Sequence, residues 1–100
     1  MTLDIREAAE ADLPQVLSLY AQPDMDDGAV LLIDGARQIL RRFAAYPDYR
    51  LFVAVDEVEN VGSYALLVMD NLGHLGAPSG VIEDFVVAPR RQREGIARRC

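Results

Sequence analysis

The sequence predicts one α/β domain in which helices flank a mixed β-sheet. Two observations support this class: the composition, and the order of the helical and strand-like patterns. The chain has 100 residues, of which 51% are hydrophobic and 26% are charged, values typical of a single small globular domain. The patterns follow the order β-α-α-β-β-β-α, without an internal repeat, a low-complexity segment or a linker. We therefore expect residues 1–100 to form one domain.

The first strand and the first helix are predicted within the first twenty residues. Residues 3–6 alternate apolar and charged side chains, as a half-buried strand does. Asp12 and Gln15 have the spacing of a capping box, and Pro14 lies in the tolerant first turn of the helix that follows. The apolar side chains of this helix recur at helical spacing, at Leu13, Val16, Leu17 and Tyr20. Residues 22–28 have the composition of a loop.

A second helix is predicted to begin near Asp34, its N-cap, and to end before Pro47. Its apolar stripe consists of Ala36, Ile39, Leu40 and Phe43. Three strands follow, at residues 51–55, 61–69 and 81–88. The polar link 57–60 makes the first two an antiparallel hairpin. Residues 70–80 have the composition of a loop, and a third helix begins near Gly95.

The charge of the chain is unevenly distributed. The net charge is −6, and all ten basic residues are arginines. Residues 1–89 carry fifteen acids and five arginines, whereas residues 90–100 carry five arginines and one acid. An acidic body disfavours general nucleic-acid binding, which depends on neutralising phosphates. The basic cluster suits a compact polyanion, and the alternative is a solvated, arginine-rich start of a helix.

Cysteine usage and hydropathy indicate the compartment. Cys100 is the only cysteine, so an internal disulfide is excluded and a reducing compartment fits best. The N-terminus has no apolar segment of signal-peptide type, and no apolar run reaches membrane-spanning length. We therefore expect a soluble, cytoplasmic protein that binds neither membranes nor nucleic acid.

The last segment, VVAPRRQREGIARRC, has the properties of a phosphate-binding turn. The first N–H groups of a helix have no partners within the helix, and the helix dipole adds positive charge there. Gly95 lets the backbone approach a ligand closely, and the small Ala97 keeps the first turn open. Flanking arginines add charge-assisted hydrogen bonds. Alone, Gln-x-x-Gly-x-Ala is a weak signal, because many strand-to-helix turns carry a glycine for packing only.

The segment IEDFVVAPRRQREGIARR resembles the core motif of the GNAT superfamily of acyl-CoA-dependent N-acyltransferases. The matching residues are Gln92, Gly95 and Ala97, which follow an apolar strand and Pro89. The opening IREAAEADLPQVLSLY and the segment FVAVDEVENVGSYALLV are similar to the first strand and helix and to the first hairpin of that family. The sequence departs from the pattern at Arg93, where the family often has glycine, and at Ala97. The resemblance implies a mixed, mostly antiparallel sheet with flanking helices, the acyl-CoA N-acyltransferase fold.

The resemblance also implies an activity and a binding site. Acetyl-CoA would be the cosubstrate, without a metal, and a primary amine would attack it directly in a ternary complex. Main-chain groups of the fourth strand would pair with the pantetheine arm, and one N–H would polarise the thioester carbonyl. The turn and the helix that follow would bind the pyrophosphate. The implied cofactor-binding residues are Phe85, Val86, Val87, Arg91, Gln92, Arg93, Glu94, Gly95, Ile96, Ala97 and Arg98.

Two carboxylates of the fourth strand are candidate general bases, Glu83 and Asp84. An alkyl ammonium with a pKa of about 10 must lose a proton before it can attack. Because neighbouring residues of a strand face opposite sides, we expect only one of the two to face a given site, and we favour Glu83, acting directly or through a water. The alternative is that the carboxylate caps backbone groups or pairs with an arginine.

Other polar and aromatic residues are weaker candidates. His74 is the only histidine, the residue type whose charge can change near neutral pH, but a lone loop histidine is more often solvated than functional. The acids of the loop after the first helix would attract a cationic amine or be merely solvated; they are Asp24, Asp26 and Asp27. The aromatic side chains of the helical segments are expected in the core or at its rim; they are Tyr20, Phe43 and Tyr46.

In the GNAT pattern the third helix continues past the position of Cys100, and further strands and a helix follow it. They close the substrate cleft and usually supply a tyrosine as general acid. We expect a chain that is cut short, a fragment, or a chain completed by a second copy, and poor acetyl transfer by this polypeptide alone. Because unpaired sheet edges associate, we expect a homodimer. The acceptor is a small molecule or a protein amine, and the alternative function is a non-catalytic acyl-CoA-binding module.

Overall fold

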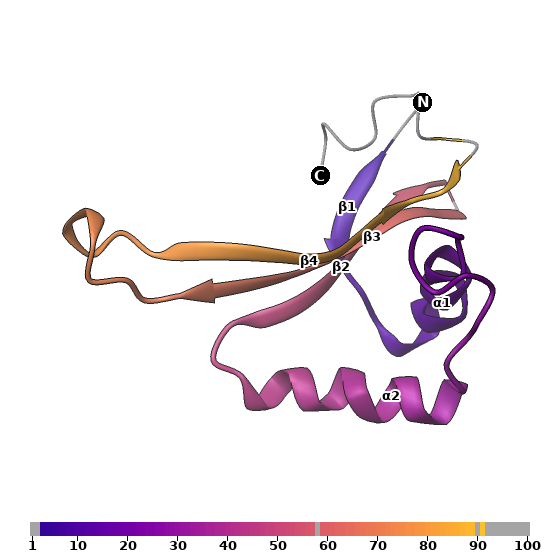
Figure 1. Ribbon diagram of the computed structural model, residues 1–100, viewed down its shortest axis with the longest axis horizontal. Coiled ribbons are helices and arrows are strands. Elements are labelled where there is room, and N and C mark those ends of the chain that lie inside the picture. Colours follow the sequence, from indigo (N-terminus) through magenta and orange to yellow (C-terminus); the bar gives the residue numbers. More distant parts are fainter. Residues whose placement is uncertain (1–2, 58, 90, 92–100) are drawn as a thin grey trace.

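The computed structural model describes residues 3–57, 59–89 and 91 (Figure 1). In this part of the chain four strands form one antiparallel sheet in the order β1-β2-β3-β4. The main elements are β1 (Asp4–Glu7), α1 (Leu13–Tyr20), α2 (Ile33–Arg42), β2 (Tyr49–Asp56), β3 (Glu59–Met69) and β4 (Ser79–Val87). Short 3-10 turns are η1 (Glu10–Asp12), η2 (Phe43–Ala45) and η3 (His74–Gly76). The predicted class and the order of elements through β4 are confirmed, and the predicted third helix lies outside the described residues.

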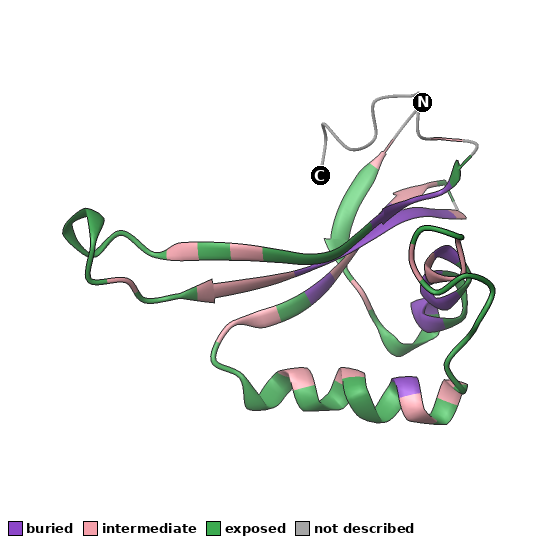
Figure 2. Ribbon diagram, viewed as in Figure 1, coloured by how far each residue is buried: buried purple, intermediate pink, exposed green. Residues whose placement is uncertain are grey.

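Both α-helices pack on one face of the sheet and form the main core with it (Figure 1). The period of the strands explains the contribution of β2, because Leu51 and Val53 point to the helices while Ala54 points to the other face. The apolar stripe of α1 packs against these side chains, and its residue Val16 is fully buried. Figure 2 shows the buried positions where α1 meets the sheet, whereas the projecting end of the β3–β4 hairpin is exposed.

The opposite face of the sheet carries a row of stacked aromatic rings. Phe52 of β2 stacks on Tyr64 of β3 with ring centroids 5.4 Å apart, and Tyr64 stacks on Phe85 of β4 at 6.1 Å. Phe52 and Tyr64 are register partners, so the row crosses the sheet at right angles to its strands. This row joins the middle of β4 to the centre of the sheet on the side away from α1 and α2.

The prediction that Asp12 and Gln15 form a capping box is wrong. Asp12 is the residue before α1, but its side chain makes no cap bond to that helix. Its carboxylate accepts two hydrogen bonds from the Arg6 guanidinium, both at 2.8 Å, one from the Ala9 N–H at 2.7 Å and one from the Asn60 amide at 3.2 Å. Gln15 Oε1 accepts a bond from the Asn60 N–H at 2.8 Å. Both side chains therefore attach the start of α1 to strands of the sheet, which a local capping pattern does not reveal.

The second helix begins two residues earlier than its predicted N-cap, Asp34, implies. Leu32 has the extended backbone of the N-cap position, and α2 starts at Ile33. Asp34 thus lies in the first helical turn, where the negative charge of a carboxylate interacts favourably with the helix dipole. Its Oδ1 accepts a hydrogen bond from the Arg37 guanidinium at 3.2 Å.

We predict that Asp12→Asn lowers the free energy of unfolding at pH 7 by about 2 kcal/mol, because the Arg6 guanidinium loses its charged acceptor. Hydrogen bonds from Arg6 hold the pKa of the Asp12 carboxyl well below its usual range, against the opposing effect of burial. The unfolded chain titrates this carboxyl near pH 3.9, so it binds more protons than the folded chain below that pH. The stabilisation is therefore present above about pH 4 and is lost as the pH falls further.

Urea unfolding followed by circular dichroism at pH 7 and at pH 3 measures this effect. The parent chain should lose more stability on acidification than the Asp12→Asn variant does. An equal loss in both chains would contradict the proposed role of the Asp12 carboxylate.

Candidate functional site

The middle of β4 contains a bulge. Ser63 of β3 is opposite Val86 of β4, and Ala65 is opposite Glu83, so two residues of β4 oppose the single residue Tyr64. One of the two is Asp84, whose backbone is left-handed with φ 53°. Such a backbone is uncommon for residues other than glycine, and aspartate is among the side chains that tolerate it best. The bulge therefore introduces local strain at a carboxylate, a combination that is frequent at functional sites.

The bulge brings Glu83 and Asp84 to the same cavity. Both line a space of about 310 Å³, together with Tyr46, Tyr49 and two apolar side chains of the β3–β4 hairpin. The expectation that only one of the two carboxylates faces a given site is wrong. The alternation of a regular strand does not hold across the bulge, because Asp84 is the extra residue with a left-handed backbone.

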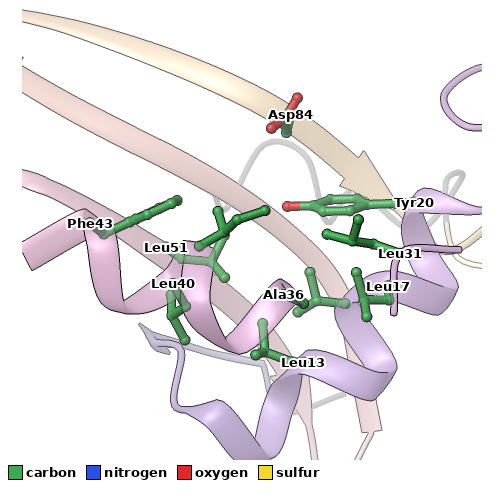
Figure 3. A pocket seen from close by; sticks show the side chains of 11 residues that line it. Leu13, Leu17, Tyr20, Leu31, Ala36, Leu40, Phe43, Leu51 and Asp84 are labelled. Atoms are coloured by element: carbon green, nitrogen blue, oxygen red, sulfur yellow. The ribbon is translucent and has the colours of Figure 1, made fainter. Parts of the chain in front are cut away.

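A second, apolar cavity of about 110 Å³ lies between α1, α2 and the sheet, and Asp84 also borders it (Figure 3). Its walls are almost entirely hydrocarbon and aromatic side chains: Leu13, Val16, Leu17, Tyr20, Leu31, Ala36, Ile39, Leu40, Phe43 and Leu51. Asp84 is the one charged residue among the described residues that line it. The two cavities thus share one carboxylate.

Burial and the negative charge of the bulge raise the pKa of two tyrosines. The pKa of Tyr20 is raised to about 12, mainly because the phenol is buried and further because of the negative charge of Asp84, while a hydrogen bond with Ser63 acts in the opposite direction. The pKa of Tyr49 is also raised, first by burial and then by the charges of Asp84 and Glu83. Both phenols are therefore protonated at neutral pH, next to the carboxyl groups of the bulge.

The segment predicted to hold the pantetheine arm is the end of β4. Val86 and Val87 are buried, whereas Phe85 is 41% exposed. Among the described strands β4 pairs with β3 only, so its other edge is the place where an extended amide-bearing arm can pair with main-chain groups. The Gln22 amide donates a hydrogen bond to the Val87 carbonyl at 2.9 Å. The segment after α1 thus reaches the end of β4.

Arg91, predicted to contribute to phosphate binding, forms an ion pair with the sheet. Its Nη2 donates a hydrogen bond to Asp56 of β2 at 2.8 Å, and the two side chains are only 12% and 22% exposed. A direct contact of Arg91 with phosphate stays a prediction. The remaining residues predicted for this role lie outside the described part of the chain; they are Gln92, Arg93, Glu94, Gly95, Ile96, Ala97 and Arg98.

The weaker candidates lie in different places. His74 begins η3, at the end of the β3–β4 hairpin that projects away from the helices (Figure 1). Of the acids after α1, Asp26 lies near enough to contribute to the raised pKa of Tyr20. Phe43 stacks on Tyr49 with ring centroids 4.1 Å apart, and both pack against the main core. Tyr46 contacts Tyr49 edge-on and is 55% exposed.

The sequence placed Tyr20 in the core or at its rim and indicated no role for Tyr49. Neither residue carries a local motif that points to a site. Their proximity to the carboxylates follows from the packing of α1 and from the register of β2. Within residues 3–57, 59–89 and 91, no three His, Cys, Asp or Glu side chains converge in a way that can hold a metal ion. In the same residues, neither α-helix is long and apolar enough to span a membrane.

The chain matches a known protein family and is similar to several solved structures. The model of the acetyltransferase (GNAT) family matches residues 5–100. The chain is similar to the solved structure of the "Putative acetyltransferase from Agrobacterium tumefaciens str. C58", with 28% identity and a TM-score of 0.82 over 96% of this chain and 66% of that one. It is also similar to an aminoglycoside acetyltransferase from an uncultured soil metagenomic sample, with 26% identity and a TM-score of 0.68 over 97% of this chain and 63% of that one.

A further similar structure, a transcriptional regulator from Bacillus halodurans C-125, shares the fold, with 22% identity and a TM-score of 0.81 over 98% of this chain and 68% of that one. No match to the chain was found among curated proteins. The chain thus spans about two thirds of the length of the solved structures that it resembles.

We predict that Asp84→Val lowers the free energy of unfolding by about 1–2 kcal/mol, because a β-branched side chain is strained at a positive φ. Asp84→Asn serves as the matched variant, since asparagine tolerates the same backbone and has nearly the same size. Urea unfolding of the two variants measures the difference. If the valine and asparagine variants are equally stable, Asp84 does not hold the left-handed position of the bulge.

Proposed function

The chain belongs to the acetyltransferase (GNAT) family, and from this premise we propose that it moves an acetyl group from acetyl-CoA to a primary amine. The observation that carries the proposal is the bulge of β4, which gathers two carboxylates beside the segment predicted to hold the pantetheine arm. The family match supports acetyl transfer in general. Acetyl-CoA as the cosubstrate and a primary amine as the acceptor are our proposal, and it applies to the protein that contains this chain.

The described residues fit a cosubstrate at the outer edge of β4. Acetyl-CoA, when bound there, supplies an acetyl group already activated as a thioester. The main-chain groups of Phe85, Val86 and Val87 hold the arm in an extended conformation, and an N–H of this segment donates to the thioester carbonyl. The amides of residues 93–97, which lie outside the described part of the chain, would hold the pyrophosphate at the start of the predicted third helix. The gain in rate comes mainly from alignment of the amine with this carbonyl.

The two carboxylates of the bulge have different roles in this proposal. Asp84 borders both cavities and holds the ammonium form of the acceptor. Glu83, in the larger cavity, takes the proton from the ammonium directly or through a water, which leaves the nitrogen lone pair free to attack. Tyr20 and Tyr49 stay protonated because the pKa of each phenol is raised, so neither competes with Glu83 as the base.

Thiol release from acetyl-CoA, measured with a panel of primary amines, tests the proposal on the 100-residue chain and on any longer polypeptide that contains it. We predict that Glu83→Gln lowers kcat about 100-fold without changing the affinity for acetyl-CoA, because only proton removal is lost. The matched control is Asp70→Asn, which removes one exposed carboxylate outside both cavities. Acetyl-CoA binding without turnover in any of these polypeptides would instead favour the non-catalytic module.

We predict separately that Gly95→Val weakens acetyl-CoA binding about tenfold, because a side chain at the phosphate turn displaces at least one charge-assisted hydrogen bond. Isothermal titration calorimetry with acetyl-CoA measures this loss. Acetyl-pantetheine, which lacks the pyrophosphate, is the control ligand, and its affinity should not change. An equal loss for both ligands would show that the substitution acts on the fold and not on phosphate contact.

A further inference from the structure

The apolar cavity beside the bulge combines hydrocarbon walls with one negative charge. Figure 3 shows Asp84 over the rim of the cavity, near the Tyr20 hydroxyl, with leucine side chains of α1 and β2 around the space. The volume of about 110 Å³ is somewhat smaller than that of an apolar cavity of about 150 Å³ that takes up benzene. The space therefore suits a short alkyl group.

Solvent can reach this cavity. Leu31 and Ile39 both line it and are 49% and 43% exposed, so it is not sealed within the core. Leu31 belongs to an apolar segment whose neighbours Val30 and Leu32 are also exposed, by 57% and 82%. A ligand can therefore enter past this segment without unfolding of α1 or the sheet.

The charge at the rim has no counter-ion among the described residues. Asp84 forms no ion pair or hydrogen bond in the described part of the chain, although several arginines elsewhere in it are paired with acids. The Tyr20 hydroxyl lies near Asp84 in Figure 3 and carries no positive charge. A carboxylate at the mouth of an apolar cavity is complementary to a cation attached to a hydrocarbon body.

We infer that the acceptor is a primary amine on a short alkyl body, with its ammonium against Asp84 and its hydrocarbon chain in the cavity lined by Ala36, Ile39 and Leu51. This inference rests on the proposed function and names the substrate class of the same site. The chemistry is unchanged: Glu83 takes one proton from the ammonium, and the freed amine forms a bond to the acetyl carbon as the C–S bond breaks. The nitrogen loses its second proton to the departing thiolate, which leaves as the thiol.

The walls discriminate against other amines. A sugar or a second ammonium group placed in this cavity loses its hydration. Among the described residues that line the cavity it meets only the Tyr20 hydroxyl and Asp84, and the first ammonium already occupies Asp84. An alkyl group loses nothing on the same transfer and gains about 0.8 kcal/mol per methylene, which is about a fourfold gain in affinity. The cavity thus favours alkyl monoamines over amino sugars and diamines of the same length.

Straight-chain amines from methylamine to octylamine test the inference. We predict that kcat/KM for thiol release rises about fourfold per methylene until the cavity is full and then stops rising, and that diamines of equal length are at least tenfold poorer. A titration of the same amines without acetyl-CoA, followed by NMR of the protein, should show the same dependence of affinity on chain length. Alcohols of the same length should bind more weakly than amines, and Asp84→Asn should remove that difference.

Two substitutions change the size of the cavity in opposite directions. Ala36→Val narrows it and should move the best amine to a shorter chain, whereas Ile39→Ala enlarges it and should move the best amine to a longer one. Ile39 is half-exposed, so its variant tests the inference even if Ala36→Val unfolds. Leu72→Ala, at a fully exposed position of the β3–β4 hairpin, is the control and should leave the preferred length unchanged.

The outcomes separate this inference from the proposed function. Acetylation that is insensitive to chain length, or a preferred length that neither cavity variant moves, overturns the alkylamine inference and leaves acetyl transfer intact. Binding of alkylamines with the expected dependence on length, but without acetylation, supports the ligand class and overturns the proposed activity. Absence of both binding and acetylation overturns the inference and the activity together.

Discussion

Between Ser63 and Ala65, β4 must accommodate one more residue than β3 while both strands stay paired on either side. The pairing of Val86 with Ser63 and of Glu83 with Ala65 leaves no other place for the extra residue. Asp84 absorbs it with a left-handed backbone. This constraint turns two successive carboxylates toward one cavity, and it also separates the largely exposed first half of β4 from its buried end.

The position of α1 determines which side chains surround the bulge. The start of this helix is attached to the sheet, because Asp12 accepts hydrogen bonds from the Arg6 guanidinium and Gln15 accepts one from the Asn60 N–H. From this anchor the helix runs across the sheet, and its last residue, Tyr20, lies close enough to Asp84 for that charge to raise the pKa of the phenol. The segment after it continues to the end of β4. The polar network at one end of α1 thus determines the environment of the carboxylate at the other.

The electrostatics of the site follow from this geometry. Burial and the neighbouring carboxylates both raise the pKa of Tyr20 and of Tyr49, so the two phenols are neutral at pH 7. A site with acids, neutral phenols and apolar walls attracts a cation and places its apolar part in the dry region. A substrate amine is such a cation at neutral pH, and it becomes a nucleophile only after one of these acids has taken its proton.

The sequence by itself determined which segments are helices and strands, since the periods of 3.6 and 2.0 residues are local properties of the chain. The stripe of α1 and the apolar runs of β2 and β3 were therefore predicted correctly, as was the family. The tertiary structure alone decided what Asp12, Asp84 and Tyr20 do. Asp12 has the local pattern of a cap, but its partners come from β1 and from the start of β3. The left-handed backbone of Asp84 arises from the register between two strands, and the raised pKa of Tyr20 arises from the packing of a helix over them. Neither register nor packing leaves a trace in the spacing of neighbouring residues.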